Sequence, residues 1–226
     1  SKEDKDNALL FASTHPTMAR KADILQDGYA SGDHLKMQIT SVLLESFAFF
    51  SGFFYPLYLA SSEDKLLIET GVIISAICRD EATHGYYIGW KFQQAVKKLS
   101  EEQQQYYKDW TITQFMRLYE VECEYTELLY ADVGMTDKVK KFLGYTGNKA
   151  VQNLGYPELF PAEMCDADET VIAATGSGGH EDFFAQTSAK YKLADYEPTP
   201  DEEWAVNPKP GLQITGNQRE HAYVET

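Results

Sequence analysis

Apolar residues recur with helical spacing through the first two thirds of the chain, and no segment shows sustained alternation of apolar and polar residues. This pattern predicts an all-α core. The folded part is expected to cover residues 1–172. The predicted helices span about residues 16–30, 35–59, a stretch from Ser61 or Ser62 towards Leu99, 100–133 and 136–154.

Local signals fix three of the predicted helix starts. Pro16 suits the first helical position, because its missing N–H would have no partner there. Ser61 or Ser62, followed by acidic residues, is typical of a capped start with favourable charge in the first turn. Ser100 precedes Gln103 by three residues, which is the spacing of a capping box.

Residues 41–60 (SVLLESFAFFSGFFYPLYLA) are apolar on every side of the predicted helix, which indicates burial all round. We expect the helix to be disturbed near Gly52 or Pro56, since proline removes an i→i−4 hydrogen bond. The stretch is long enough to cross a membrane, but it contains Glu45 and Pro56 and no other stretch resembles it. The sequence therefore favours a core helix over a membrane span.

A carboxylate in such a helix needs a partner, because an isolated buried charge is costly. Glu81 and His84 follow Glu45 by 36 and 39 residues and stand three apart in another apolar helix, so they share one face and can reach one ion. Dimetal carboxylate bundles use two lone carboxylates and two Glu-x-x-His pairs. The chain contains one such pair, so Glu45, Glu81 and His84 resemble half of a metal site.

Structural alternatives without a metal stay open at this point. Glu45 could be hydrogen-bonded to Ser41, Ser46 or a tyrosine. Glu81 could pair with Arg79, Lys91 or another nearby base while His84 is a hydrogen-bonded core histidine. A run of glutamates on a later helix is interpreted as a solvated face; it comprises Glu120, Glu122, Glu124 and Glu127.

Charge and cysteine content narrow the function classes. A formal net charge of −15 argues against nucleic acid or an anionic membrane as the main partner, because both repel such a surface. The three cysteines form no CxxC pair, and an odd number is a poor disulfide framework. The first residues (SKEDKDNALL) lack the order of a signal peptide. We therefore expect a cytoplasmic protein.

The last part of the chain, residues 173–226, is rich in Gly, Ser, Pro and acidic residues and cannot bury enough surface to order itself. We predict a flexible tail. Its aromatic residues, among them Tyr191, Tyr196 and Trp204, would allow it to fold onto a partner; the alternative is an inert solvated end.

Two segments, LLESFAFFSGFFYPLY and ISAICRDEATHGYYIGWKFQ, closely resemble the radical-bearing small subunit of class Ib ribonucleotide reductase. The resemblance includes NALLFASTHPTMARKADILQDGY and YTGNKAVQNLGYPELFP and covers about residues 1–206. It implies a ferritin-like helical bundle that holds two manganese or two iron ions. Oxidation of these ions would generate a tyrosyl radical, which a separate large subunit uses to reduce ribonucleoside diphosphates.

The resemblance also implies roles for individual residues. Glu45 matches the lone glutamate ligand, and Glu81 and His84 match the second Glu-x-x-His pair. Asp80 matches an aspartate that hydrogen-bonds a metal-ligating histidine on the radical route. Tyr191 matches the tail tyrosine that passes the oxidising equivalent to the large subunit, and the DEEW segment 201–204 resembles the docking end of the tail.

The family's first aspartate ligand, first Glu-x-x-His pair and radical tyrosine would lie before residue 1. This predicts the C-terminal half of a split small subunit, completed by a chain that carries the N-terminal half. The resemblance further implies a homodimer of the completed subunit and an oxidant supplied by a flavodoxin-like activator. Two other functions stay open: a non-catalytic half-bundle scaffold, and a ferritin-like dimetal oxidase or storage protein.

Overall fold

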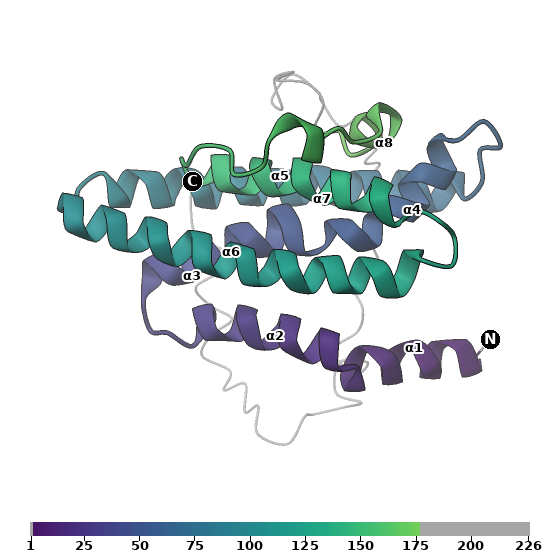
Figure 1. Cartoon of the computed structure of the whole chain (residues 1–226), viewed down its shortest axis with the longest axis horizontal. Coiled ribbons are helices and arrows are strands. Elements are labelled where there is room, and N and C mark those ends of the chain that lie inside the picture. The colour runs from purple at the N-terminus through teal and green to yellow at the C-terminus, as the bar shows by residue number, and fades with distance from the viewer. Residues whose placement is uncertain (1, 177–226) are drawn as a thin grey trace, which may run out of the picture. The chain divides into compact units, whose positions relative to one another are not determined.

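A computed structural model of the chain describes residues 2–176, and these residues are helical with no strand among them (Figure 1). The predicted all-α core is confirmed. The predicted tail lies, apart from its first four residues, outside the described residues, as do Tyr191, Tyr196 and Trp204. The helices are α1 (Lys2–Thr14), α2 (Pro16–Tyr29), α3 (His34–Leu43), a π-helical turn η1 (Leu44–Ala48), α4 (Phe50–Ser61), α5 (Ile68–Val96), α6 (Glu101–Tyr130), α7 (Thr136–Asn153), a 3₁₀ turn η2 (Ala162–Met164) and α8 (Glu169–Ala174).

The starts of α2 and α6 lie where the sequence predicts them. Pro16 occupies the first helical position of α2, and the imidazole of His15 accepts a hydrogen bond from the backbone N–H of Thr17. The hydroxyl of Ser100 accepts a hydrogen bond from the backbone N–H of Gln103. The side-chain oxygen of Gln103 accepts one from the backbone N–H of Ser100, and these two bonds form the capping box of α6.

The predicted start of the third long helix is wrong, because α5 begins at Ile68. The Ser62 hydroxyl donates instead to Leu59 O (2.7 Å) and so satisfies the end of α4. Lys65 and Leu67 then adopt left-handed backbone conformations, with φ of 47° and 55°. A right-handed helix cannot run through such residues, so the acidic residues after Ser62 lie in a loop.

The predicted disturbance at Pro56 is wrong, and the one near Gly52 is the end of an interruption that begins upstream: the Gly52 N–H donates to Phe49 O rather than to Ala48 O. The interruption is the π-helical turn η1, and Glu45 lies inside it, while Pro56 is accommodated within α4. The stretch is not buried all round either, since Phe49 is 36% exposed. Residues 34–61 are apolar and long enough to cross a membrane, but half of their most apolar window is buried inside the described fold. They form a core element.

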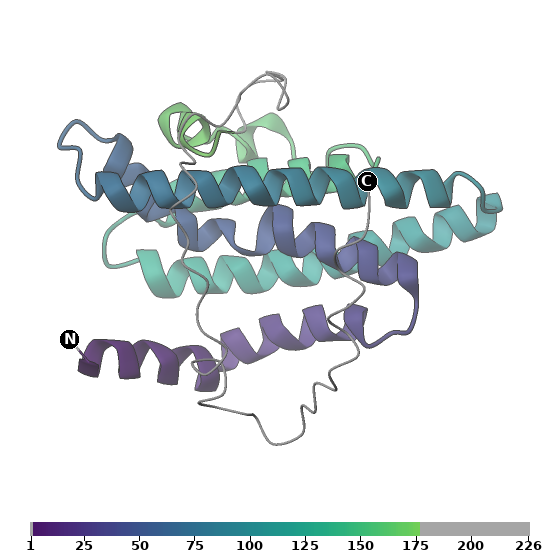
Figure 2. The ribbon, with the colours of Figure 1, turned by 180° about the vertical axis from the view of Figure 1, so that it is seen from behind.

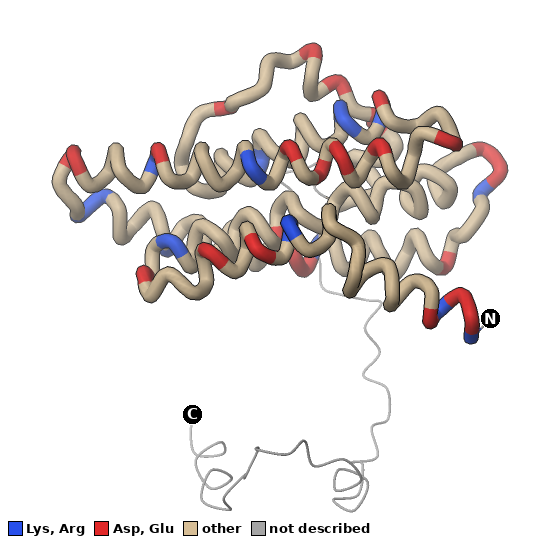
Figure 3. The backbone as a smooth tube through the Cα atoms, turned by 60° about the horizontal axis from the view of Figure 1, so that its bottom comes forward, with Lys and Arg blue, Asp and Glu red and all other residues tan. Residues whose placement is uncertain are grey.

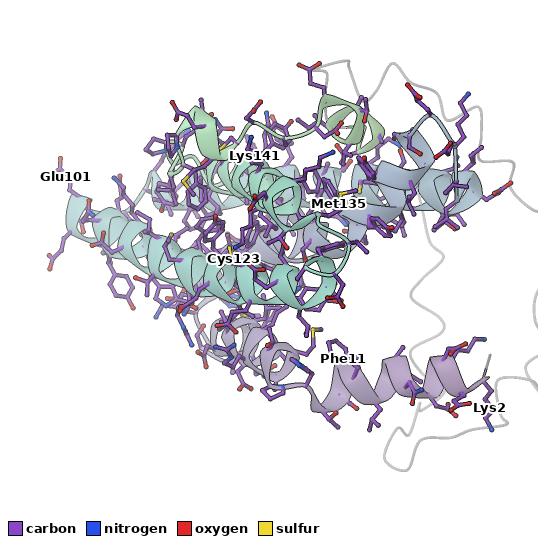
Figure 4. The ribbon with its side chains drawn as sticks, turned by 45° about the vertical axis from the view of Figure 1, so that its right-hand side comes forward. Lys2, Phe11, Glu101, Cys123, Met135 and Lys141 are labelled. Carbon is purple, nitrogen blue, oxygen red and sulfur yellow. The ribbon has the colours of Figure 1, made fainter. Side chains whose placement is uncertain are left out.

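Two α-helices, α1 and the short α8, were not predicted from the sequence. α1 has no buried residue, and Figure 4 shows it, with Lys2 and Phe11 labelled, projecting away from the other helices. Its apolar residues lack the periodic stripe that burial would require.

The core lies around α3, η1 and α4, which pack against α5, α6 and α7 (Figure 2). Its largest members are fully buried phenylalanines: Phe47, Phe54, Phe92, Phe115 and Phe142. Acidic and basic residues are interspersed along the helices (Figure 3). Several pair across helices, such as Arg117 with Asp27 at 3.0 Å.

Glycines allow α5 to approach its neighbours closely. A Cβ atom on Gly85 would lie 2.1 Å from the Ser46 hydroxyl of η1, and one on Gly89 would lie 2.2 Å from the backbone oxygen of Asn153. Both distances are far below van der Waals contact. The side of α5 that carries these glycines therefore sets the separation between α5, η1 and α7.

We expect Gly89→Ala to lower the free energy of unfolding by about 2 kcal/mol or more, because a backbone atom cannot move aside without displacing α7. Chemical denaturation measures this change. Gly52→Ala is the matched control: its Cβ would meet nothing within 4 Å, so helix propensity should leave stability unchanged or raised by up to about 1 kcal/mol. Equal effects of the two substitutions would contradict the close approach of α5 and α7.

Candidate metal centre

The structure brings Glu45, Glu81 and His84 together. One potential ligand atom from each lies within 4.8 Å of the others. His84 Nδ1 is 3.0 Å from Glu81 Oε2, as their spacing on one helix face predicts, and 3.9 Å from Glu45 Oε2. Two elements far apart in sequence therefore supply a compact set of one imidazole and two carboxylates.

The π-helical turn sets the direction of Glu45. A π turn inserts one residue into a helix, which changes the direction in which the neighbouring side chains point, and such turns are frequent at functional sites. The adjacent Ser46 accepts a hydrogen bond from the Asn153 side chain (3.2 Å) and contacts Gly85 of α5. These contacts hold η1 against α5 beside the two carboxylates.

The described residues do not show the particular partners that the sequence suggested for a site without a metal, although Glu45, Glu81 and His84 do bond to one another. Ser41 is within 3.1 Å of the Tyr29 hydroxyl, and Ser46 bonds to Asn153, so neither serine takes Glu45 as its partner. His84 is 59% exposed rather than a core histidine. Glu81 pairs with His84 and Glu45 rather than with Arg79 or Lys91.

The two carboxylates are electrostatically linked. Burial, together with the hydrogen bond and charge of Glu81, raises the pKa of Glu45 to about 7. The hydrogen bond from Glu45, together with the hydrogen bond and charge of His84, lowers the pKa of Glu81. A bound cation would remove the repulsion between the two carboxylates and favour their charged forms.

The donor set fits a manganese or iron ion. Carboxylate oxygens and imidazole nitrogen are ligands that both metals accept, and the ligand atoms are close enough to converge on one ion. Glu45 and Glu81 are each 21% exposed, and His84 is 59% exposed. The described residues therefore leave one side of the site open, where further ligands can enter.

Asp80 lies next to Glu81 on α5 and is exposed. Its carboxylate makes no side-chain hydrogen bond or ion pair with any of residues 2–176, so the histidine partner implied by the resemblance is not among them. The predicted relay residue Tyr191 lies outside the described residues.

Three members of the glutamate run, Glu120, Glu124 and Glu127, are exposed, as the interpretation of a solvated face predicts, but Glu122 is an exception. Its side chain is fully buried and forms an ion pair with Lys21 of α2. Glu124 and Glu127 also pair, with Arg20 and Lys140. The sequence signal for Glu122 is its spacing: it follows the buried Leu118 by four residues and precedes the buried Thr126 by four, which places all three on one helix face.

A profile of the family described as "Ribonucleotide reductase, small chain" matches residues 1–169. The chain belongs to the ribonucleotide reductase small chain family. It is 42% identical to the ribonucleoside-diphosphate reductase 2 subunit beta of Escherichia coli over 204 residues, which are 89% of this chain and 63% of that protein. It is 39% identical to a ribonucleoside-diphosphate reductase beta subunit of Mycobacterium tuberculosis, over 88% of this chain and 61% of that protein.

A solved small chain structure agrees with the fold. The X-ray crystal structure of Streptococcus sanguinis dimanganese(II)-NrdF superimposes with a TM-score of 0.73 at 42% identity, covering 77% of this chain and 61% of the other. The ferritin-like helical bundle expected from the sequence is confirmed. The chain spans about three-fifths of the length of these small chain relatives.

Proposed function

We propose that this chain is a component of a class Ib ribonucleotide reductase small subunit and that Glu45, Glu81 and His84 are ligands of its dimetal centre. The observation that carries the proposal is the convergence of their ligand atoms within 4.8 Å, in a member of the small chain family. Two manganese or two iron ions suit these donors, and the dimanganese relative supports manganese.

In this function a bound metal pair, once oxidised by an oxidant that the flavodoxin-like activator provides, would supply the oxidising power for a tyrosyl radical. Glu45 and Glu81 neutralise metal charge, while His84 restricts the geometry without adding charge. Asp80 positions a metal-ligating histidine and, with Tyr191, belongs to the route by which the oxidising equivalent reaches the large subunit. Reduction of ribonucleoside diphosphates to deoxyribonucleotides takes place on that large subunit.

The remaining ligands come, in this proposal, from a complementary chain that corresponds to the N-terminal half of the small subunit. The sequence contains one Glu-x-x-His pair, whereas a dimetal carboxylate bundle uses two. The open side of the site supports this arrangement, because helices placed there could deliver the missing pair. We also propose that the completed subunit forms a homodimer, that a flavodoxin-like protein activates it, and that it is cytoplasmic.

Native mass spectrometry with elemental analysis, on protein purified from its own host, tests the assembly. We expect a complex with a second polypeptide that carries a Glu-x-x-His pair, together with about two manganese or iron ions per pair of chains. A lone chain with a full complement of metal would refute the complementary chain. A complex without metal would support the non-catalytic half-bundle scaffold.

Tyr191→Phe separates a reductase component from a ferritin-like dimetal oxidase. We expect the substitution to abolish nucleotide reduction by the full assembly while metal content stays unchanged, since phenylalanine cannot form a phenoxyl radical. Tyr196→Phe is the matched control on the same segment and should retain activity. Unchanged reduction in the Tyr191 variant would show that Tyr191 is not the relay.

A further inference from the structure

A buried ion pair contacts the π-helical turn η1. The ammonium group of Lys21, on α2, contacts the carboxylate of Glu122, on α6; their side chains are 14% and 0% exposed. The Lys21 ammonium also lies 5.6 Å from the centre of the Tyr125 ring. Lys21 belongs to the inward-facing stripe of α2, between the buried Thr17 and Ile24.

The same lysine donates a hydrogen bond to the backbone oxygen of Ala48, the last residue of η1. In an uninterrupted α-helix this oxygen would accept from the N–H of Gly52, four residues later. The Gly52 N–H donates instead to Phe49 O (3.1 Å). The carbonyl group of Ala48 therefore lacks its usual backbone donor where the π-helix changes to an α-helix, and Lys21 provides a donor in its place.

Glu122, which pairs with Lys21, also contacts the start of α4. The Ser51 hydroxyl donates to the Glu122 carboxylate, and the buried Tyr130 hydroxyl donates to the backbone oxygen of Ser51 (2.6 Å). The exit of the π turn is thus held from α2 through Lys21 and from α6 through Glu122 and Tyr130. Glu45 lies in the same turn, three residues before Ala48.

We propose that Lys21 and Glu122 are positioning residues for Glu45: their ion pair fixes the exit of the π-helical turn and thereby the direction of the Glu45 carboxylate. The inference rests on the proposed role of Glu45 as a metal ligand. Groups that orient metal ligands without touching the metal typically contribute 10–100-fold to metal affinity. Loss of the Lys21 ammonium would let η1 relax and move Glu45 away from Glu81 and His84.

The test uses Lys21→Met, which keeps the length of the side chain but removes the ammonium, and the double variant Lys21→Met/Glu122→Gln. The single variant leaves the buried Glu122 charge unpaired, which destabilises the fold. The double variant removes both charges, while its amide oxygen can still accept from Ser51. In both variants, however, Ala48 O has lost the Lys21 donor.

Two readouts are compared with global stability: hydrogen exchange of the amides of residues 44–52, and Mn²⁺ affinity measured by electron paramagnetic resonance titration. We expect Lys21→Met to speed local exchange at least about 10-fold and to weaken Mn²⁺ binding by about 10–100-fold. The double variant should recover stability but keep both local defects. Recovery of exchange rate and Mn²⁺ affinity together with stability would overturn the positioning role.

Arg20→Met is the matched control, because Arg20 pairs with Glu124 across the same two helices but does not contact η1. It should leave both readouts unchanged. Mn²⁺ affinity is measured on the assembly with the complementary chain, and if the wild-type assembly binds no Mn²⁺, the proposed metal site is wrong. Exchange of residues 44–52 then decides by itself whether Lys21 holds the π turn, and unchanged exchange in Lys21→Met would refute that.

Discussion

Glu81→Ala is expected to reduce metal affinity by more than about 100-fold and to abolish radical formation in the assembled subunit. Glu81 contacts both other proposed ligands, so its removal takes away a donor and the group that holds His84 in place. Substitution of groups that only orient ligands already costs 10–100-fold, and the loss of a ligand should cost more. Elemental analysis and radical quantification by electron paramagnetic resonance measure the effect.

Glu69→Ala is the control for Glu81→Ala. Glu69 is an exposed carboxylate in the first turn of the same helix, so its removal causes the same change in net charge. Circular dichroism should show equal helix content in both variants, because Glu81 is partly exposed and contributes little to the core. Normal metal and radical content in the Glu81 variant would refute its assignment as a ligand.

Asn148→Ala is expected to lower the free energy of unfolding by about 3–5 kcal/mol, the largest stability effect among these substitutions. Asn148 is buried on α7, and its side-chain oxygen accepts from the backbone N–H groups of Leu159 and Phe160, each at 3.0 Å. Its amide nitrogen donates to Phe160 O (2.9 Å). Alanine would leave three backbone groups without these partners, and each such buried group costs about 1–3 kcal/mol.

Gln152→Ala offers a matched comparison with Asn148→Ala. Gln152 is also on α7 and also reaches the segment that follows the helix, through an exposed hydrogen bond to Glu158 (3.0 Å). Water can replace this bond, so we expect a change within about 0.5 kcal/mol. Urea denaturation of both variants measures the difference; similar losses would mean that burial of the Asn148 bonds is not what stabilises this segment.

The sequence predicted those features that depend on local spacing. Helical periodicity and the caps at Pro16 and Ser100 located α2 and α6, and the i,i+3 spacing of Glu81 and His84 predicted their contact. These interactions join residues a few positions apart. Their geometry is therefore set by the helix itself, whatever surrounds it.

The features that the sequence did not predict depend on tertiary packing. Nothing between Leu44 and Ala48 specifies an extra residue per turn, because the turn is stabilised by contacts from α2, α5 and α7. In the sequence, Glu122 is one member of an acidic run, and its ion pair with Lys21 forms only because α2 packs against α6. The left-handed conformation of Leu67 could not be predicted from its residue type either, because leucine rarely adopts it.

The number of residues in the π turn determines both which side of α4 faces the core and where the Glu45 side chain points. One residue corresponds to about 100° of rotation around a helix axis. Deleting a residue between Leu44 and Ala48 would rotate α4 relative to α3 by that angle, and the fully buried Phe54 and Leu57 would leave the core as Glu45 changed direction. Insertions and deletions in this helix therefore cannot adjust ligand geometry and core packing separately, although substitutions can.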